Sequence, residues 1–407
     1  MLNIAVLGFG FIGSGVADVF FENESIISRK TGDNINIKYI LDIKDIGDHR
    51  LADRLVRDIN IILEDPEIKL VVETLVGETP AYAFTKAALE RGISVVTSNK
   101  AVVAQHGAEL LKLAAQNGAR YFFEASVGGG IPVIRPIYSC LAANKISKIT
   151  GILNATTNFI LTKMGSESLS FEAALEIAQE LGYAERDPTS DVSGADTCRK
   201  LCILSSLAFG RHVPPTRVKA EGITGITLED IKNAEKMRCK IKLVAKAERI
   251  SDGVQLVAAP MLVSADSPLY NIDDIFNGVI VTGNMTGDVM FYGKGAGKPP
   301  TSSAIVADVI DALTHSTKNM HWEESDGGFI LDNKLRRSGY YIRAGYADLE
   351  KAFKIINQAF AGADICESGT RGEIFFITDK FDKSGLEAKI EILTDAKLEI
   401  KSRIRIL

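Results

Sequence analysis

The 407-residue chain lacks the marks of several protein classes. Its longest apolar run, around Leu201–Phe209, is too short to cross a bilayer. Its first residues have no basic segment of the kind that opens a secretory signal. No basic run offsets the net charge of −5, so nonspecific binding to nucleic acid is not expected. These absences favour a globular protein of the cytoplasm, with no membrane or nucleic-acid partner.

Clustered cysteines and histidines are also lacking. The five cysteines, at positions 140, 198, 202, 239 and 366, follow no spacing typical of a disulfide framework, which suits reduced thiols. The five histidines form no group with metal-ligand spacing. We therefore expect neither disulfide bonds nor a zinc site.

A glycine-rich turn is the first positive feature. Residues 3–7 predict a short apolar strand and about 12–28 a helix, with Gly8-Phe9-Gly10-Phe11-Ile12-Gly13 between them. In this arrangement the first glycine permits the turn, the second lets the backbone approach a pyrophosphate, and the third lets helix and strand pack closely. The helix N-terminus offers unpaired N–H groups to the phosphates. We predict a dinucleotide-binding site, with candidate residues Gly8, Gly10, Phe11, Ile12 and Gly13.

Strands continue to alternate with helices as far as residue 126. Strands are predicted at 37–43, 69–75, 93–98 and 120–126, and helices between the first two, at 81–92 and from about 100 to 117. Such alternation predicts a doubly wound parallel sheet, of the Rossmann type, over 1–130. Ligands of such sheets lie beyond the carboxyl ends of the strands. The candidate residues at those ends are Asp42, Thr74, Thr97, Ser98 and Lys100.

The pattern changes after residue 130. Helices are predicted at 131–141, 156–165, 171–181, 194–209 and 228–239, and strands near 146–153, 241–249, 254–264, 278–283 and 288–292. These predict an α/β substrate domain with a mixed sheet over 131–297. The glycine run 293–297, which could also be a hinge, opens a last helix at about 302–314. Polar residues 316–336 predict a linker, and 337–407 has the β-α-β-β-α-β order of ferredoxin-like domains.

Charged residues gather where an apolar helix begins, between positions 178 and 200. A helix over 171–181 ends at Gly182, a loop YAERDPTSD follows, and a second helix starts near Asp191 or Ser193. Asp196 and Lys200 lie four residues apart on one face of its first turns. Charges beside a buried helix are costly unless they are paired or used. The alternative is an ordinary surface ion pair.

The same stretch resembles the signature of the homoserine dehydrogenase family. Every position of that signature is filled, by Ala178, Gly182, Tyr183, Ala184, Asp187, Pro188, Asp191, Val192, Gly194, Asp196 and Lys200. The segments VVTSNKAVVA, YFFEASVGGGIPVIRP, GILNATTNFIL and YGKGAGKPPTSSA extend the resemblance over residues 1 to about 315. Two departures are Ala155, where relatives usually have glycine, and TLVGET at 74–79, which is less glycine-rich than usual.

The resemblance implies an enzyme that interconverts L-aspartate 4-semialdehyde and L-homoserine with NADPH or NADH, in threonine, methionine and isoleucine biosynthesis. It looks monofunctional, because no aspartate kinase region precedes the first strand. Lys200 would be the proton donor, oriented by Asp196, and Lys100 would lie where nicotinamide and substrate meet. Glu185 and Asp191 would bind the substrate amino group. A solvated helix start for Lys100, and a merely exposed acidic loop, are the alternatives.

Other site residues also come from the resemblance. In the family, the segment similar to 298–315 returns to the nucleotide domain and touches the nicotinamide side, which adds Gly297 to the cofactor-binding residues. Residues 124–131 resemble a monovalent-cation loop. In that loop the Glu124 carboxylate and the carbonyls of Val127, Gly129 and Ile131 would suit Na⁺. The pattern alone also fits a glycine-rich hinge between domains.

The preference between NADP and NAD stays open. NADP-using relatives often carry arginine immediately before the acid that ends the second strand, whereas Leu41 precedes Asp42 here. Lys44, Arg50 or Arg54 could still supply the charge that a 2′-phosphate needs. The residues slightly favour NAD, or the use of both NAD and NADP.

The C-terminal region resembles the ACT domain, which often binds amino acids. We expect threonine or methionine as the effector, a homodimer or homotetramer, and a folded, active enzyme after removal of residues beyond about 320. A dimerisation or stability module is the alternative. Rival functions are a catalytically inactive amino-acid sensor of the same build and a related amino-acid or semialdehyde dehydrogenase.

Overall fold

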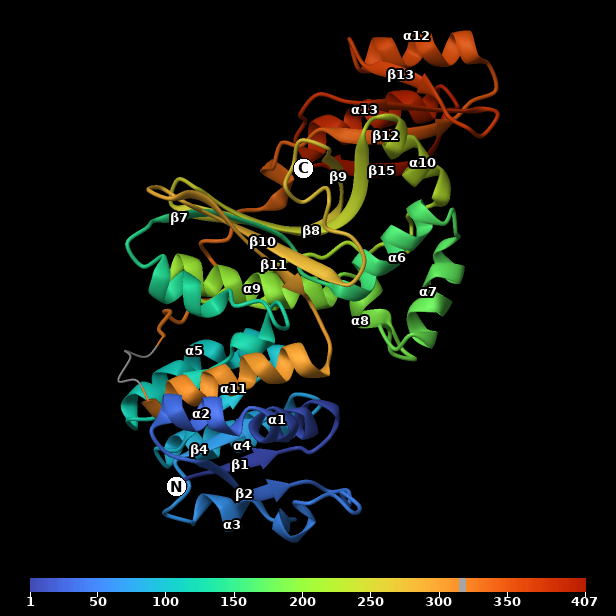
Figure 1. Cartoon of the computed structure of the whole chain (residues 1–407). Helices are drawn as coiled ribbons and strands as arrows, with labels where there is room; N and C mark the ends of the chain where they lie inside the picture. Colours follow the sequence, from blue (N-terminus) through green and yellow to red (C-terminus); the bar gives the residue numbers. More distant parts are fainter. Residues whose placement is uncertain (315–319) are drawn as a thin grey trace. The chain divides into compact units, whose positions relative to one another are not determined.

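The computed structural model describes residues 1–314 and 320–407, which form two compact units (Figure 1). The first unit comprises Met1–Ser147, Cys202–Arg217 and Val279–Gly327, and the second comprises Lys148–Leu201, Val218–Gly278 and Gly328–Leu407. Helix α9 (Ala195–Phe209) contributes residues to both. No helix within the described ranges is both long and apolar enough to cross a membrane.

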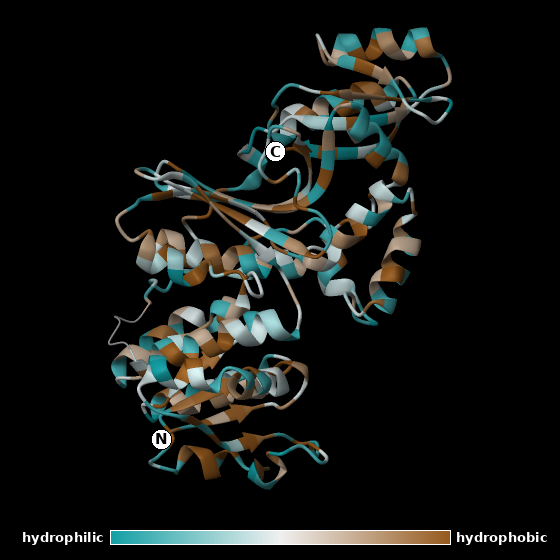
Figure 2. Ribbon diagram, viewed as in Figure 1, coloured by the Kyte–Doolittle hydropathy of each residue, from teal (hydrophilic) through white to brown (hydrophobic). Residues whose placement is uncertain are grey.

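A six-stranded parallel sheet forms the centre of the first unit. Its strand order is β3-β2-β1-β4-β5-β6, so the doubly wound sheet predicted from the sequence is confirmed. Its strands are β1 (Leu2–Leu7), β2 (Ile35–Leu41), β3 (Leu55–Val56), β4 (Leu70–Glu73), β5 (Ser94–Thr97) and β6 (Tyr121–Phe122). The central strands are hydrophobic along most of their length (Figure 2), because helices cover both faces of such a sheet. Successive strands are added on one side of β1 as far as β3 and on its other side from β4 onward, and ligands of this fold bind at that switch between β1 and β4.

The helices of this unit are α1 (Phe11–Glu22), α2 (Glu24–Thr31), α3 (Ile59–Leu63), α4 (Thr79–Glu90), α5 (Lys100–Gln116) and α11 (Lys298–Thr314). Helix α11 lies beside α1, which it contacts through the ion pair of Lys298 with Asp18 (2.7 Å) and the hydrogen bond of Ser302 Oγ to the carbonyl of Ile12 (Figure 1). Residues near position 300 therefore return to the glycine-rich turn, as the family resemblance implied.

Several predicted elements of the first unit differ from the structure. The helix predicted over 12–28 is two helices, because Asn23 (φ −113°, ψ 19°) interrupts it. The polar helix predicted after the second strand is replaced by β3 and the short α3. The strand predicted at 120–126 ends at Phe122, because Glu124–Ser126 forms a 3₁₀ turn. The helix predicted at 131–141 is only a five-residue π-helix, Pro136–Cys140.

A mixed sheet forms the second unit, as predicted. Its strands lie in the order β7-β8-β9-β15-β12-β14-β13. They are β7 (Ile146–Ile152), β8 (Cys239–Ile250), β9 (Gly253–Ser264), β12 (Tyr340–Gly345), β13 (Asp364–Glu367), β14 (Glu373–Ile377) and β15 (Glu399–Ile406). Two further strands, β10 (Phe276–Gly283) and β11 (Gly287–Lys294), neighbour each other. The helices are α6 (Ala155–Ser166), α7 (Phe171–Glu180), α8 (Thr189–Val192), α10 (Leu228–Lys236), α12 (Leu349–Ala359) and α13 (Lys383–Asp395).

The C-terminal segment has the predicted β-α-β-β-α-β order, with its strands arranged β15-β12-β14-β13. It is not an independent appendage, because β15 pairs in parallel with β9 through Arg405–Met261 and Ile406–Leu262. One hydrophobic core also includes residues of α6, α10 and β8 together with Tyr341, Phe375 and Ile404. Cutting the chain near residue 320 would remove Tyr341, Phe375 and Ile404 from that core, and the stability and activity of the truncated enzyme stay a prediction.

The predicted linker, 316–336, is only partly described, because 315–319 lie outside the described residues. The part that follows is held in place. Trp322 is 2% exposed and packs edge-on against Phe123, with ring centroids 5.6 Å apart. Further on, Val254 exchanges backbone hydrogen bonds with Phe329 and Leu331. This stretch is polar in composition, yet its few apolar side chains anchor it.

A buried charge network ties α10 to the C-terminal strands. The Arg343 guanidinium donates to Asp230 Oδ1 (2.8 Å), to Glu373 Oε2 (2.5 Å) and to Thr227 Oγ1 (2.9 Å). Asp230 is fully buried and also closes a capping box with Thr227 at the start of α10. Buried charges of this kind are tolerated only while their partners are present.

Replacing Arg343 with methionine should therefore destabilise the protein strongly. Methionine keeps much of the side-chain volume but leaves the Asp230 carboxylate buried without its cation, at a cost of about 3–5 kcal/mol. Urea unfolding followed by tryptophan fluorescence and circular dichroism measures the change. The matched control is Arg403→Met, since Arg403 pairs with Glu387 at an exposed site and should contribute less than about 1 kcal/mol. Equal effects of the two substitutions would show that the network does not hold α10 to the sheet.

Candidate active site

The glycine-rich turn after β1 has the geometry of a phosphate-binding site. Gly8 adopts φ +88°, which disfavours other residues, and a Cβ at Gly13 would collide with the Gly8 carbonyl oxygen. A Cβ at Gly10 would meet no protein atom within 4 Å, so the space before the turn is open. Helix α1 begins at Phe11 with no side-chain cap, which leaves its first N–H groups to a ligand. These residues fit the pyrophosphate of a dinucleotide.

Residues at the carboxyl ends of neighbouring strands support this turn. The Thr74 hydroxyl, just after β4, donates to the Gly8 carbonyl (2.7 Å). Asp42, just after β2, accepts from the backbone N–H of Phe9 (2.7 Å) and of Lys44 (2.9 Å). Two predicted cofactor residues, Thr74 and Asp42, are thus brought to the turn itself.

The cations named above as candidates for a 2′-phosphate are engaged elsewhere or lie at the surface. Arg54 donates to Asn36 Oδ1 (2.5 Å) and to the carbonyl of Ile37, along β2. The Arg50 guanidinium lies over the ring of Phe21. Lys44 is exposed. Arg57, which the sequence analysis missed, donates to the carbonyls of residues 42 and 44 and so fixes the loop that carries Asp42.

A buried carboxyl group lies at the same edge of the sheet and was not anticipated. Glu73, the last residue of β4, is fully buried and accepts from the Thr97 hydroxyl (2.6 Å) and the Leu75 N–H (2.7 Å). Burial raises the pKa of Glu73 to about 7. Asn99, also missed, donates from its backbone N–H to Thr97 Oγ1 and from its side chain to the Gly77 carbonyl (2.7 Å). An acid in the apolar run KLVVETL was the available signal.

Asn99 also caps helix α5, at whose start two predicted residues lie. Its Oδ1 accepts from the N–H of Val102 (3.3 Å). Ser98 and Lys100 flank it and are half-buried, in the first unit. Lys100 is therefore not a fully solvated surface lysine.

The second unit holds the predicted acid–lysine pair. Lys200 Nζ lies 2.8 Å from Asp196 Oδ2 and donates to the Leu153 carbonyl at 2.9 Å. Lys200 is 9% exposed and Asp196 2%, so an ordinary surface ion pair is excluded. The pair sits on the first turns of α9, one turn apart, as the spacing predicted.

Asn154 connects this pair to a third predicted residue. Its Nδ2 donates to Asp191 Oδ1 (2.7 Å) and to Asp196 Oδ2 (2.9 Å). Its Oδ1 accepts from the N–H of Thr157, which caps α6. Asn154 belongs to the segment GILNATTNFIL, but no role was predicted for it. An asparagine just before a helix was the signal, and it indicates only the cap.

The acidic loop is partly ordered by short-range bonds. The predicted loop YAERDPTSD contains the short helix α8, because the Asp187 carboxylate accepts from the N–H (3.1 Å) and hydroxyl (2.6 Å) of Thr189. These bonds hold the pKa of Asp187 below its usual value. Glu185 is exposed, and within the described part of the chain no hydrogen bond joins its carboxylate to the Lys200 cluster.

Glu124, the predicted side-chain ligand of a cation, has three backbone partners. Its carboxylate accepts from the N–H groups of Val133 (2.6 Å), Ile134 (2.7 Å) and Arg135 (2.8 Å). Burial raises its pKa. No group of acidic, histidine or cysteine side chains suited to a metal occurs within the described ranges. The carbonyls of Val127, Gly129 and Ile131 stay a predicted cation site.

The glycines of this loop have a packing role. A Cβ at Gly129 would collide with the backbone of Gly295, and one at Gly130 with Pro300. Both contacts lie within the first unit. They bring the loop against residues 295–300, a segment that includes the predicted cofactor residue Gly297 (φ +121°). Close packing therefore accounts for these glycines without a hinge.

Comparisons with known proteins agree with this geometry. A family model described as "Homoserine dehydrogenase, NAD binding domain" matches residues 8–124, and one described as "Homoserine dehydrogenase" matches 132–310. A homoserine dehydrogenase of Synechocystis sp. is 40% identical over 334 residues, which cover 78% of this chain and 75% of that protein. One from Bacillus subtilis is 37% identical, over 81% and 76%.

Two solved structures are similar to this chain, the first over its full length and the second over about four fifths of it. A homoserine dehydrogenase from Thiobacillus denitrificans superposes with a TM-score of 0.91 at 32% identity, covering 100% of this chain and 98% of that one. A hyperthermophilic archaeal homoserine dehydrogenase in complex with NADPH superposes with a TM-score of 0.65 at 28% identity, covering 79% and 99%.

The buried carboxyl of Glu73 should make stability depend on pH. Its pKa in the folded protein, about 7, lies above the ordinary 4.5, so the protonated form favours folding. This contribution is present below about pH 4.5 and is lost as pH rises through 7. Glu73→Gln should remove this pH dependence. Between pH 4.5 and 7 the free energy of unfolding of the variant should therefore rise relative to that of the wild type, by up to about 3 kcal/mol.

Thermal unfolding across that range tests the assignment to Glu73. Glu90→Gln serves as the matched control, since Glu90 is an exposed residue of α4 in the same unit. Parallel curves for wild type and Glu73→Gln would contradict the raised pKa.

Proposed function

The chain belongs to the homoserine dehydrogenase family, and from this premise we propose that Lys200 is the proton donor and acceptor of its reaction. The protein is an NAD(P)-dependent oxidoreductase that interconverts L-aspartate 4-semialdehyde and L-homoserine. The catalytically inactive sensor is not favoured, since the described residues retain the complete Lys200–Asp196–Asp191 set. The buried Lys200–Asp196 pair is the observation that carries the proposal.

Nicotinamide dinucleotide, when bound, supplies or takes the hydride at the substrate carbon. The chain's own residues hold it. The N-terminus of α1 and the backbone of the glycine-rich turn would bind the pyrophosphate, with Asp42 towards the ribose hydroxyls. Thr74 keeps the turn in shape through its bond to Gly8.

Lys200 then moves the proton. An ammonium has three N–H donors, of which Asp196 and the Leu153 carbonyl bind two. The third can be donated to the aldehyde oxygen, and that proton passes to the oxygen as the carbon gains hydride, forming the hydroxyl of homoserine. In the reverse direction the neutral amine takes the hydroxyl proton. Asp196 stabilises the ammonium, and Asn154 is a positioning residue that holds Asp196.

The remaining site residues have proposed roles of substrate recognition. Asp191, linked to Asp196 through Asn154, offers a carboxylate oxygen to the substrate ammonium. Glu185, on its exposed loop, would offer a second carboxylate to the substrate ammonium. Lys100, half-buried at the start of α5, would act where nicotinamide and substrate meet.

Three finer features complete the proposal. Na⁺ would bind the carbonyls of the 127–131 loop, supported by hard oxygen ligands in a tight turn. The ferredoxin-like strand order supports an ACT-type module that binds threonine or methionine. A homodimer or homotetramer follows from the tendency of such modules to pair. The shared core of Tyr341 and Phe375 with α6 gives an effector a physical route to the catalytic region.

Lys200→Ala should lower kcat by roughly 10²–10⁴, the usual range for lost acid–base catalysis, without weakening NADPH binding. The rate is followed by reduction of NAD⁺ or NADP⁺ on addition of L-homoserine, and NADPH affinity by its fluorescence. Lys163→Ala is the matched control, because Lys163 lies on α6 in the same unit and pairs with Glu167 near the surface.

The pH profile gives an independent readout for Lys200. Homoserine oxidation by the wild type should rise towards alkaline pH, because the lysine must be neutral to accept the proton. A near-normal kcat for Lys200→Ala, or a flat profile in the wild type, would remove Lys200 from this role.

The enzyme should also use NAD⁺ at a measurable rate. Leu41 is buried and cannot anchor a 2′-phosphate, Arg54 is bound along β2, and the Asp42 carboxylate beside the turn would repel that phosphate. Asp42→Asn keeps an acceptor for the Phe9 N–H and should shift kcat/KM towards NADP⁺, by about tenfold for 1.4 kcal/mol of lost repulsion. Steady-state kinetics with both cofactors decide the matter. A wild-type NADP⁺ preference of several hundredfold would show that cations elsewhere dominate.

A further inference from the structure

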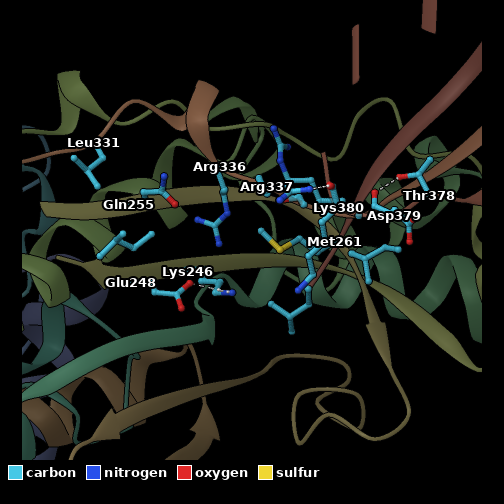
Figure 3. Close-up of a pocket in the computed structure, with 16 residues that line it drawn as sticks. Lys246, Glu248, Gln255, Met261, Leu331, Arg336, Arg337, Thr378, Asp379 and Lys380 are labelled. Carbon is cyan, nitrogen blue, oxygen red and sulfur yellow. Dashed lines mark hydrogen bonds and ion pairs between the residues drawn. The ribbon is translucent and has the colours of Figure 1, made fainter. Parts of the chain in front are cut away.

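A cavity of about 750 Å³ lies in the second unit, and Figure 3 shows the residues that line it. Its walls come from the β8–β9 hairpin, from residues 336–339 before β12, from the end of β14 and from the last residues of β15. None of the residues with a proposed catalytic or cofactor role lines it. Its volume lies in the usual range for a site that takes a small organic molecule.

Positive charge dominates the lining. Five cationic side chains face two acidic ones: Lys246, Arg336, Arg337, Lys380 and Arg405 against Glu248 and Asp379. Lys246 pairs with Glu248 (3.4 Å), as Figure 3 shows, and Arg405 pairs with Glu221 outside the cavity. Arg337 donates to the carbonyl of Lys380, which fixes its guanidinium without neutralising it. A net positive charge therefore remains.

Arg336 is a lining residue with a buried nitrogen that lacks a hydrogen-bond partner among the described residues. In Figure 3 it extends into the space between Gln255 and the Lys246–Glu248 pair. Its Nη1 is buried, and residues 1–314 and 320–407 offer it no hydrogen-bond partner. Burial lowers the pKa of Arg336, and the positive charge of Arg405 lowers it further, against the attraction of Glu248. A buried, unpaired guanidinium nitrogen costs free energy that an anion would recover.

We propose that this cavity binds a small organic anion, through carboxylate or phosphate oxygens held by Arg336 and its cationic neighbours. The planar guanidinium suits either oxyanion, because both accept two parallel N–H bonds. The apolar side chains of Ile250, Met261 and Leu331 also line the cavity and would pack against the carbon skeleton of the ligand. Inorganic phosphate alone would leave that surface uncovered.

Such a ligand would join three parts of the second unit. The β8–β9 hairpin contributes Lys246, the segment before β12 contributes Arg336, and the loop after β14 contributes Lys380. An anion bound by all three would hold the C-terminal strands to the hairpin and raise the unfolding temperature. The inference does not depend on the proton-transfer role of Lys200, since it concerns a separate set of residues.

Calorimetric titration and thermal unfolding of the full chain test the proposal. The probes are pyrophosphate for phosphate chemistry and succinate for carboxylate chemistry, each compared with NaCl at equal ionic strength to separate binding from screening. We expect saturable binding of at least one probe and a higher unfolding temperature. Arg336→Met should weaken that binding by roughly tenfold or more, as expected for one lost charged hydrogen bond.

Two further variants assign the effect to the cavity. Arg403→Met removes one charge from β15 at an exposed position outside the cavity and should bind like wild type. Lys380→Met, at an exposed position on the cavity rim, should weaken binding by a smaller factor and does not risk the fold. Without a probe, Arg336→Met should unfold at or above the wild-type temperature.

The outcomes separate the possibilities. Loss of binding in Arg336→Met but not in Arg403→Met supports the site. The probe whose binding is lost shows whether the site prefers a phosphate or a carboxylate ligand. Unchanged binding in Arg336→Met and Lys380→Met would overturn the proposal, since pyrophosphate would then occupy the glycine-rich turn instead. A response no larger than that to NaCl would overturn it as well.

Discussion

The buried ion pair between Lys200 and Asp196 is the constraint on which the catalytic part of the second unit depends. Two charges can be kept from water only when each has partners, and here these are the Leu153 carbonyl and the Asn154 amide. Both partners sit between the end of β7 and the start of α6, so that junction must lie against the first turns of α9. The bonds that make burial tolerable would also orient Nζ for the proton transfer proposed above.

The first unit meets the opposite requirement, because its backbone groups must stay open to a ligand. Gly10 and the uncapped start of α1 leave N–H groups facing open space, while Thr74 supports the turn from the neighbouring strand. Glu73 holds the carboxyl ends of β4 and β5 together by accepting hydrogen bonds from Thr97 and Leu75. Its burial is tolerated because the carboxyl can take a proton near neutral pH.

The C-terminal strands are part of the second unit's architecture rather than an addition to it. They share a hydrophobic core with α6, contribute Arg343 to a buried network with α10, and add β15 to the edge of β9. The cationic cavity is lined both by the β8–β9 hairpin and by residues of this C-terminal segment. A ligand there would act on the strands that carry this core, so stability and any regulation would be coupled through packing.

Local spacing in the sequence was enough to determine the alternating strands and helices, the glycine-rich turn, the β-α-β-β-α-β order and the i,i+4 placement of Asp196 with Lys200. Each depends on residues close together in the chain, where hydrophobic period and turn chemistry act directly. The predicted ends of strands and helices were wrong where contacts beyond the local turn set the backbone. One example is the segment 124–134, where the Glu124 carboxylate accepts from the N–H groups of Val133 and Ile134.

Only the tertiary structure decided which polar groups are buried and with whom. Asn154 reads as a helix cap, Glu73 as the end of a strand and Arg336 as part of a polar linker, yet each role comes from partners tens of residues away. The physical reason is that desolvation and hydrogen-bond pairing depend on what surrounds a group in space, which the spacing of residues along the chain does not specify.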